Sequence, residues 1–392
     1  MIEYRENSTG EDRSVMKEKQ LTVWEAACII TGYGIGGGVL AMPYIVERNG
    51  LPVSFLILLV AFAASWLLHM MIADVAQKAG EGMQIVSVLS RFLFRGKAKN
   101  VLTMLFFVLM AFVLVTNLTA YVIGAAEVLA GFVPVPLFAA KLIFYVAAAV
   151  VVVFGLKAVG ISEKYAVAAI FLLVGVLAVA CFLAPAHPLP MKAGTAGDML
   201  SFFSMAMLSF GAFFSIPQAV EGLGGDEKKV RKAIFLGLGN NFILIIVITF
   251  CSLLASSEVT EVAMTGWSAG IGGWAQIVGG LFTVLAMLTT YWSISLALSG
   301  IIRDQFRWDN RICWLLATAP SLILALVNIG SFIDFLELAS GAIAILVAVM
   351  LIPTYRNARK EVPGTMMGIW GGTVFQILTA AAYVLMAIGS VM

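Results

Sequence analysis

The chain has 392 residues, of which 61% are hydrophobic and 12% charged, with a formal net charge of +2. The mean hydropathy is +1.01, and the charged fraction is about half that of ordinary soluble domains. This composition excludes a water-soluble fold, because a globular core cannot absorb so much apolar surface. The net charge is too small to indicate a nucleic-acid partner.

Eleven apolar stretches are long enough to cross a bilayer as helices, which takes about 20 residues each. They lie at 22–47, 51–77, 100–130, 136–156, 162–184, 198–222, 232–256, 272–302, 310–328, 331–353 and 366–390. We therefore predict an all-α integral membrane protein with about eleven transmembrane helices. Residues 1–20 are polar, and we expect them to form a disordered cytoplasmic tail.

Positive charge gathers on one side of this predicted topology. Of the 24 Lys and Arg residues, only Arg48, Lys141 and Lys192 fall on the opposite side. Basic loops remain in the cytoplasm during insertion. We therefore predict a multi-pass protein of the cell membrane with a cytoplasmic N-terminus and, from the odd helix count, an external C-terminus.

The first and sixth predicted helices share the pattern G-x5-P-x2-V-E, at Gly37–Glu47 and again at Gly211–Glu221. Five helices separate the two starts, so the second copy crosses the membrane in the opposite direction. Inverted repeats of this kind are typical of secondary transporters. We predict a single transporter domain at 21–390, with repeats at about 21–185 and 196–353 and an extra helix at about 366–390.

Glycine and proline are concentrated in these two helices. Five of the seven residues from Gly32 to Gly38 are glycine, which disfavours a regular helix, and Pro43 removes a backbone donor. Free backbone groups in the membrane are tolerated where they are buried or line a cavity. We predict that both helices are broken and that the first break binds a polar substrate. The alternative is a glycine face that packs closely against other helices.

Three segments carry a resemblance to a known family. GIGGGVLAMPY (Gly34–Tyr44) resembles the first-helix signature of the amino acid/auxin permease family, within the amino acid–polyamine–organocation superfamily. FGLKAVGISEKY (Phe154–Tyr165) is similar to the superfamily's loop between the fourth and fifth helices, and FSIPQAVEGLGGDEKKVRKAI (Phe214–Ile234) resembles the family's sixth helix and following loop. The resemblance weakens after about Arg311. It implies a leucine-transporter-like fold and amino-acid transport by alternating access.

The middle thirds of the predicted helices hold almost no charge, which favours a small neutral or hydrophobic amino acid as the substrate. Its carboxylate is expected at the positive end of the outer half-helix. The amides there belong to Gly34, Ile35, Gly36, Gly37 and Gly38.

Two further groups could line the substrate pocket. Phe210, Phe213 and Phe214 could wall the side-chain site, or face lipid or the protein core. Asn117 and Tyr121 are four residues apart and share a helix face, so they could line the cavity or bond neighbouring helices.

Thr289 and Thr290 offer hydroxyls that either bond back to their own helix or coordinate a hard cation. The resemblance implies a sodium site completed by carbonyls around Tyr33 and Gly36. In similar proton-coupled proteins a lysine of the fifth helix occupies the sodium position, where this chain has Ile170. Sodium is therefore the expected coupling ion. A proton, with Glu337 as a proton or gate residue, and uncoupled exchange remain open.

The spans carry no paired carboxylates, metal cluster or nucleophile–base motif, so an enzyme is not expected. A membrane amino-acid sensor of the germinant-receptor type is the alternative function. The expected partners are a small amino acid and the lipid bilayer, with no nucleic acid and no cofactor beyond the coupling ion. We expect a monomer or a weak oligomer.

Overall fold

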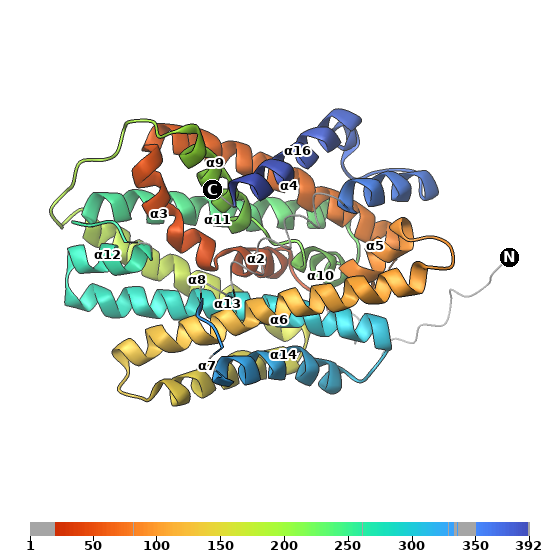
Figure 1. The fold of residues 1–392 in the computed structure, drawn as a ribbon, viewed down its shortest axis with the longest axis horizontal. Helices are drawn as coiled ribbons and strands as arrows, with labels where there is room; N and C mark the ends of the chain where they lie inside the picture. Colours follow the sequence, from red (N-terminus) through yellow and green to blue (C-terminus); the bar gives the residue numbers. More distant parts are fainter. Residues whose placement is uncertain are drawn as a thin grey trace.

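The computed structural model describes residues 20–80, 82–260, 262–327, 329–332, 335 and 350–390. The regular elements within these ranges are all helical, and the long helices lie side by side along the longest axis of the molecule (Figure 1). Six of them are long and apolar enough to cross a membrane. They are α4 (Leu51–Ala79), α6 (Lys99–Phe132), α8 (Leu156–Cys181), α11 (Glu227–Ala255), α13 (Gly273–Phe306) and α14 (Asn310–Val327).

Two further helices are interrupted, as the sequence predicted for the first and sixth. The half-helices are α2 (Val23–Gly34) with α3 (Gly37–Asn49), and α9 (Ala196–Ser209) with α10 (Ser215–Gly222). The first pair meets at a bend of 57°, and residues 210–214 separate the second pair. The aligned glycines Gly37 and Gly211 both lie at a break. The prediction of an all-α membrane fold with two broken helices is confirmed.

The remaining helices are shorter. They are α5 (Ile85–Leu93), α7 (Leu137–Val153), α12 (Ala263–Ile271), a 3-10 turn η1 (Gly368–Gly371), α16 (Thr373–Gly389) and a helical run at 350–361. The predicted spans leave α5 and α12 in the connections between them. Each of these helices has nine residues, which is too few to span the hydrocarbon. The number of spanning helices stays a prediction. Glu337 and most of the predicted helix 331–353 lie outside the described residues, as does the tail at 1–19.

One predicted boundary is wrong. The predicted spans 136–156 and 162–184 leave 157–161 as a connection, whereas α8 starts at Leu156 and includes these residues. Gly155 makes the turn with a φ of 83°, a left-handed value that glycine adopts easily. The helix then starts at Leu156, because residues such as Val159 and Glu163 pack inward one turn apart. Glu163 is thereby drawn into the membrane domain.

Contacts between loops divide the bundle into two ends. We call one of them the basic end, where Arg95 pairs with Glu361 at 2.9 Å and Lys157 with Glu25 at 2.6 Å. Figure 1 shows α5 at the opposite extreme of the molecule from α12. At the far end, the Leu51 amide donates to the Pro190 carbonyl at 2.8 Å. Segments that the charge pattern assigned to the same side of the membrane are therefore in contact at the basic end.

We predict that a tag at Met1 is cytoplasmic and a tag after Met392 is external. The first described helix starts at the basic end, where the Leu21 amide bonds the Gly222 carbonyl at 2.7 Å. The last described helix, α16, terminates at the opposite end of the bundle, where Gly389 packs against Leu200. Protease or fluorophore accessibility of both tags in intact cells measures this. Two tags on the same face would show that the odd helix count is wrong.

Candidate substrate and ion site

The break between α2 and α3 frees backbone amides at the centre of the bundle. Gly36, at φ −54° and ψ −157°, lies between the two half-helices and caps α3. The first N–H groups of a helix have no acceptor within it, so those of Gly37 and Gly38 need partners from outside α3. They also mark the positive end of the α3 dipole, which attracts an anionic group.

The second break, at residues 210–214, is held by a buried histidine. His69 on α4 is fully buried, and its Nε2 accepts the Ala212 amide at 3.0 Å. Its Nδ1 therefore carries the proton and donates to the Ser65 carbonyl at 2.6 Å. The imidazole ring also stacks on Phe213, with ring centroids 5.5 Å apart. His69 satisfies an amide that the break frees, a role that the sequence did not reveal.

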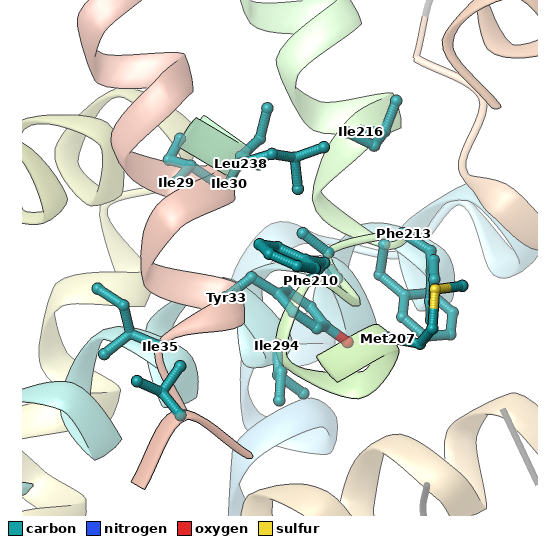
Figure 2. Packing of buried hydrophobic residues seen from close by; sticks show 14 of the residues in the cluster. Ile29, Ile30, Tyr33, Ile35, Met207, Phe210, Phe213, Ile216, Leu238 and Ile294 are labelled. Carbon is teal, nitrogen blue, oxygen red and sulfur yellow. The ribbon is translucent and has the colours of Figure 1, made fainter. Parts of the chain in front are cut away.

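A cavity of about 40 Å³ lies between the two breaks. Figure 2 shows Tyr33 reaching from α2 toward Phe213 and Met207, beside this region. The cavity is lined by Tyr33, Gly34, Gly36, Gly37, Gly38, Asn117, Tyr121, Leu208, Ser209, Gly211, Phe213, Thr290 and Ile294. Among the residues that the structure describes, the lining includes no Lys, Arg, His, Asp or Glu side chain. It therefore combines backbone, hydroxyl, amide and apolar groups from α2, α3, α6, α9 and α13.

Most of the predicted substrate residues meet at this cavity, but three do not line it. The Ile35 amide donates to the Thr31 carbonyl at 3.0 Å, so it is not free for a carboxylate. Phe210 packs edge-on against Phe62, with ring centroids 5.7 Å apart. Phe214 stacks on Tyr33 at 6.3 Å. The expectation that these three residues line the pocket is corrected. For Phe210 and Phe214, side-chain direction depends on a break whose geometry the sequence does not specify, and the amide of Ile35 still belongs to the last turn of α2.

The structure adds residues that the sequence analysis missed. Leu208, Ser209, Gly211 and Ile294 join the lining. Asn241 of α11 packs directly on Gly34, where an added Cβ would also lie 2.8 Å from the Ser209 carbonyl. The sequence signal in α11 was the adjacent pair Asn240 and Asn241, which interrupts the apolar part of that helix.

Several buried polar atoms around the cavity have no hydrogen-bond partner in the described part of the chain. They include the Tyr33 hydroxyl and the Asn117 Oδ1, both on cavity-lining residues. Burying such atoms without a partner costs about 1–3 kcal/mol each. A polar ligand in the cavity would offset that cost.

The hydroxyls of the two threonines proposed as sodium ligands point to different partners. The Thr289 hydroxyl donates to the Ala286 carbonyl of its own helix at 2.8 Å and does not line the cavity. Thr290 lies 2.9 Å from the Gly32 carbonyl of α2 and 3.0 Å from the Ala286 carbonyl. The Tyr121 hydroxyl lies within bonding reach of both Thr290 and the Gly37 backbone. Thr289 is therefore corrected to a back-bonding residue, while Thr290 joins α13 to α2.

Solved transporters share the fold of this chain. Mhp1, a nucleobase-cation-symport-1 family transporter in a closed conformation with bromovinylhydantoin bound, superposes with a TM-score of 0.63 at 15% identity, covering 95% of this chain and 91% of that one. MhsT in complex with L-phenylalanine gives 0.62 at 14%, covering 93% and 97%. The fold is thus the leucine-transporter-like fold.

The chain belongs to the tryptophan/tyrosine permease family, whose model matches residues 19–390. Glutamine transporter 2 of Aliivibrio fischeri is 23% identical over 356 residues, 86% of this chain and 90% of that protein. The prediction of an amino-acid transporter rather than an enzyme is confirmed. The narrower assignment to the amino acid/auxin permeases is not confirmed, whereas the fold that it implied is.

Replacing Gly36 with valine should weaken substrate binding. An added Cβ would overlap the Tyr121 hydroxyl and approach Thr290 Oγ1 at 3.3 Å, so the break must shift. Losing one hydrogen bond to a charged carboxylate lowers affinity by roughly tenfold or more. Binding of labelled amino acids to purified protein measures the effect.

Gly175→Val is the matched control, because a Cβ at that exposed α8 position meets nothing within 4 Å. Thermal unfolding and size-exclusion profiles of both variants report whether folding is retained. Unchanged affinity in a folded Gly36→Val protein would identify this glycine as a packing residue alone.

Proposed function

We propose that this protein imports a small neutral or hydrophobic amino acid across the cell membrane, driven by sodium, by alternating access around the central cavity. The observation that supports it is the cavity itself, where the free end of α3 meets unpartnered polar atoms and an apolar wall. In this proposal the basic end faces the cytoplasm.

The two charged groups of the substrate have different binding places. The carboxylate binds the amides of Gly36, Gly37 and Gly38, at the positive end of α3. The ammonium faces the negative end of α2 and the Ser209 carbonyl, which lies beside Gly34. A zwitterion satisfies both ends without a charged side chain, which is consistent with the uncharged lining.

The size of the cavity favours a small substrate in this conformation. A buried water needs roughly 10–15 Å³ by the same measure, so 40 Å³ accommodates only a few atoms. The side chain of the substrate would extend toward Leu208, Phe213 and Ile294. A larger aromatic substrate requires these side chains to move apart as the site opens.

The clefts at the basic end support alternation. One of about 240 Å³ and another of about 140 Å³ both reach Glu221, at the end of α10. Glu221 lies 3.7 Å from Arg303 and 3.4 Å from the Gln84 side-chain amide. Opening toward this end would separate α10 from α13 at these contacts.

The sodium proposal now rests on fewer side chains. Thr290 and the α2 carbonyls around Tyr33 and Gly36 are its ligands, since sodium, like other hard cations, takes oxygen ligands. Thr289 contributes through its backbone or through the shape of α13. Glu337 is kept as a possible gate residue in this proposal, although it lies outside the described residues.

Uptake into proteoliposomes tests the proposal directly. We expect labelled neutral amino acids, but not lysine or glutamate, to accumulate under an inward sodium gradient and to stop when choline replaces sodium at fixed pH. Thr290→Ala should raise the sodium concentration for half-maximal uptake, because one ligand is lost. Thr289→Ala is the matched control and should change it little, because that hydroxyl bonds its own helix.

The outcomes separate the alternatives. Uptake that persists in choline but collapses with a protonophore would make sodium the wrong ion. Specific binding without uptake or exchange would instead favour the sensor. Failure to bind any amino acid would overturn the proposed substrate class.

A further inference from the structure

A second cavity, of about 450 Å³, opens between α4 and α11 near the far end of the bundle. We call it the outer groove, and it shares no lining residue with the central cavity. Leu58 of α4 and Phe250 of α11 lie on its walls, and Val46 of α3 and Phe202 of α9 also line it. Phe55, another lining residue, is 46% exposed, so the groove reaches the outer surface of the bundle, which faces lipid in a membrane. Its volume is within the range of about 300–1,000 Å³ that is typical of ligand sites.

The shape of the outer groove is fixed by contacts on two sides. Toward the middle of the bundle, α4 and α11 contact each other through two phenylalanine rings whose centroids are 5.3 Å apart. At the far end, the connection 182–195 between α8 and α9 is bonded to both helices (Figure 1). The His187 amide donates to the Leu254 carbonyl of α11 at 2.8 Å, and the Pro190 carbonyl accepts the Leu51 amide of α4 at 2.8 Å. The groove is therefore held open between two helices that are joined above and below it.

Two buried hydroxyl groups line this otherwise apolar groove. Ser54 of α4 is 3% exposed and Thr249 of α11 is 5% exposed. Serine and threonine in helices usually bond back to a carbonyl of their own helix. Neither of these hydroxyls has a hydrogen-bond partner among the described residues. Leaving such a group unsatisfied costs about 1–3 kcal/mol, so the groove suits a ligand that is mainly hydrocarbon but carries an acceptor at this point.

The depth of the two hydroxyls identifies that acceptor. Ser54 is three residues from the start of α4 at Leu51, and Thr249 is six residues from the end of α11 at Ala255. At 1.5 Å per residue they lie roughly 5 Å and 9 Å in from the helix ends. The polar layer of a bilayer is about 5–8 Å thick on each side. Both hydroxyls therefore lie where the polar layer meets the hydrocarbon, which is the level of the ester carbonyls of a glycerolipid.

Lys192 places a positive charge beside the groove. It follows Met191, a lining residue that is 65% exposed. No ion pair of Lys192 occurs in the described part of the chain. Nearby Arg48 is engaged, because it bonds the Tyr44 hydroxyl at 2.6 Å and its charge acts on Asp198. Lys192 is therefore the cation that a phosphate group at this edge of the groove would meet.

We propose that the outer groove binds one acyl chain of a membrane phospholipid whose head group has a net negative charge. The chain packs between α4 and α11, an ester carbonyl accepts hydrogen bonds from Ser54 and Thr249, and the phosphate pairs with Lys192. A free fatty acid fits less well, because one carboxylate cannot meet both the buried hydroxyls and Lys192. The proposed transport function does not enter this inference, since the groove is separate from the central cavity.

Photocrosslinking tests the site. The protein is reconstituted into phosphatidylcholine vesicles that contain phosphatidylglycerol with a diazirine on one acyl chain, and labelled residues are mapped by mass spectrometry. We expect labelling to concentrate on the groove segments of α4 and α11, at 51–58 and 245–250, and to be competed by unlabelled phosphatidylglycerol. Leu172 of α8, which is 68% exposed, represents the ordinary lipid-facing surface and should be labelled weakly and without saturation.

Two variants separate the hydroxyls from the space that they line. Ser54→Ala combined with Thr249→Val removes both donors at nearly constant volume. It should raise the mole fraction of phosphatidylglycerol needed for half-maximal competition by roughly tenfold, because two hydrogen bonds are lost. Leu189→Trp fills the groove and should abolish the saturable labelling, whereas Leu172→Trp is the matched control and should leave it unchanged. Thermal unfolding of each variant reports whether the fold is retained.

Lys192→Gln tests the charge. It should remove a several-fold preference for phosphatidylglycerol over phosphatidylcholine as competitor, while the acyl chain still labels the groove. High salt should reduce the same preference in the wild-type protein, because exposed charges are screened.

The contrary results are equally specific. Labelling that is even around the bundle, or that persists in a folded Leu189→Trp protein, would identify ordinary bilayer lipid and overturn the inference. Saturable labelling by a diazirine fatty acid that phosphatidylglycerol does not displace would also overturn it. So would an unlabelled groove, including one that a second copy of the chain covers, which native mass spectrometry would show as a dimer.

Discussion

Everything in this site depends on one constraint: within a membrane, backbone N–H and C=O groups must find partners inside the protein. A continuous helix satisfies this constraint with its own hydrogen bonds. The breaks in α2–α3 and α9–α10 leave backbone groups that such bonds do not satisfy. Neighbouring helices supply part of what is missing, through His69 at Ala212 and Thr290 at Gly32. The groups that remain surround a cavity with an uncharged lining, which makes a zwitterion a suitable partner.

The glycines of α2 and α3 serve two roles that the sequence analysis set against each other. Alternate glycines each allow close approach by a different helix. The pairs are Gly32 with Glu163 of α8, Gly34 with Asn241 of α11, Gly36 with Tyr121 of α6 and Gly38 with Ser209 of α9. Close packing therefore brings polar side chains up to the broken backbone, so packing and ligand binding are the same feature here.

The sequence predicted the breaks well, because glycine and proline act locally on the backbone. It could not choose between Thr289 and Thr290, which point about 100° apart, since that choice depends on the rotation of α13 against α2. It placed Glu163 near a connection because no side chain caps the start of α8 at Leu156, so the sequence did not mark that start. It overlooked Asn241 because a single amide gives no hint of which helix it will meet.

The position of α13 against α2 would link the proposed ion site to the proposed substrate site. Thr290 and Ser293 are three residues apart and so lie on one face of α13. Each meets a different carbonyl of α2, at Gly32 and at Ile29. A cation in the proposed sodium site would change what the Thr290 hydroxyl can donate, and therefore how firmly α2 is held. Because α2 ends at the break, the same change acts on the amides that would bind the carboxylate of the substrate.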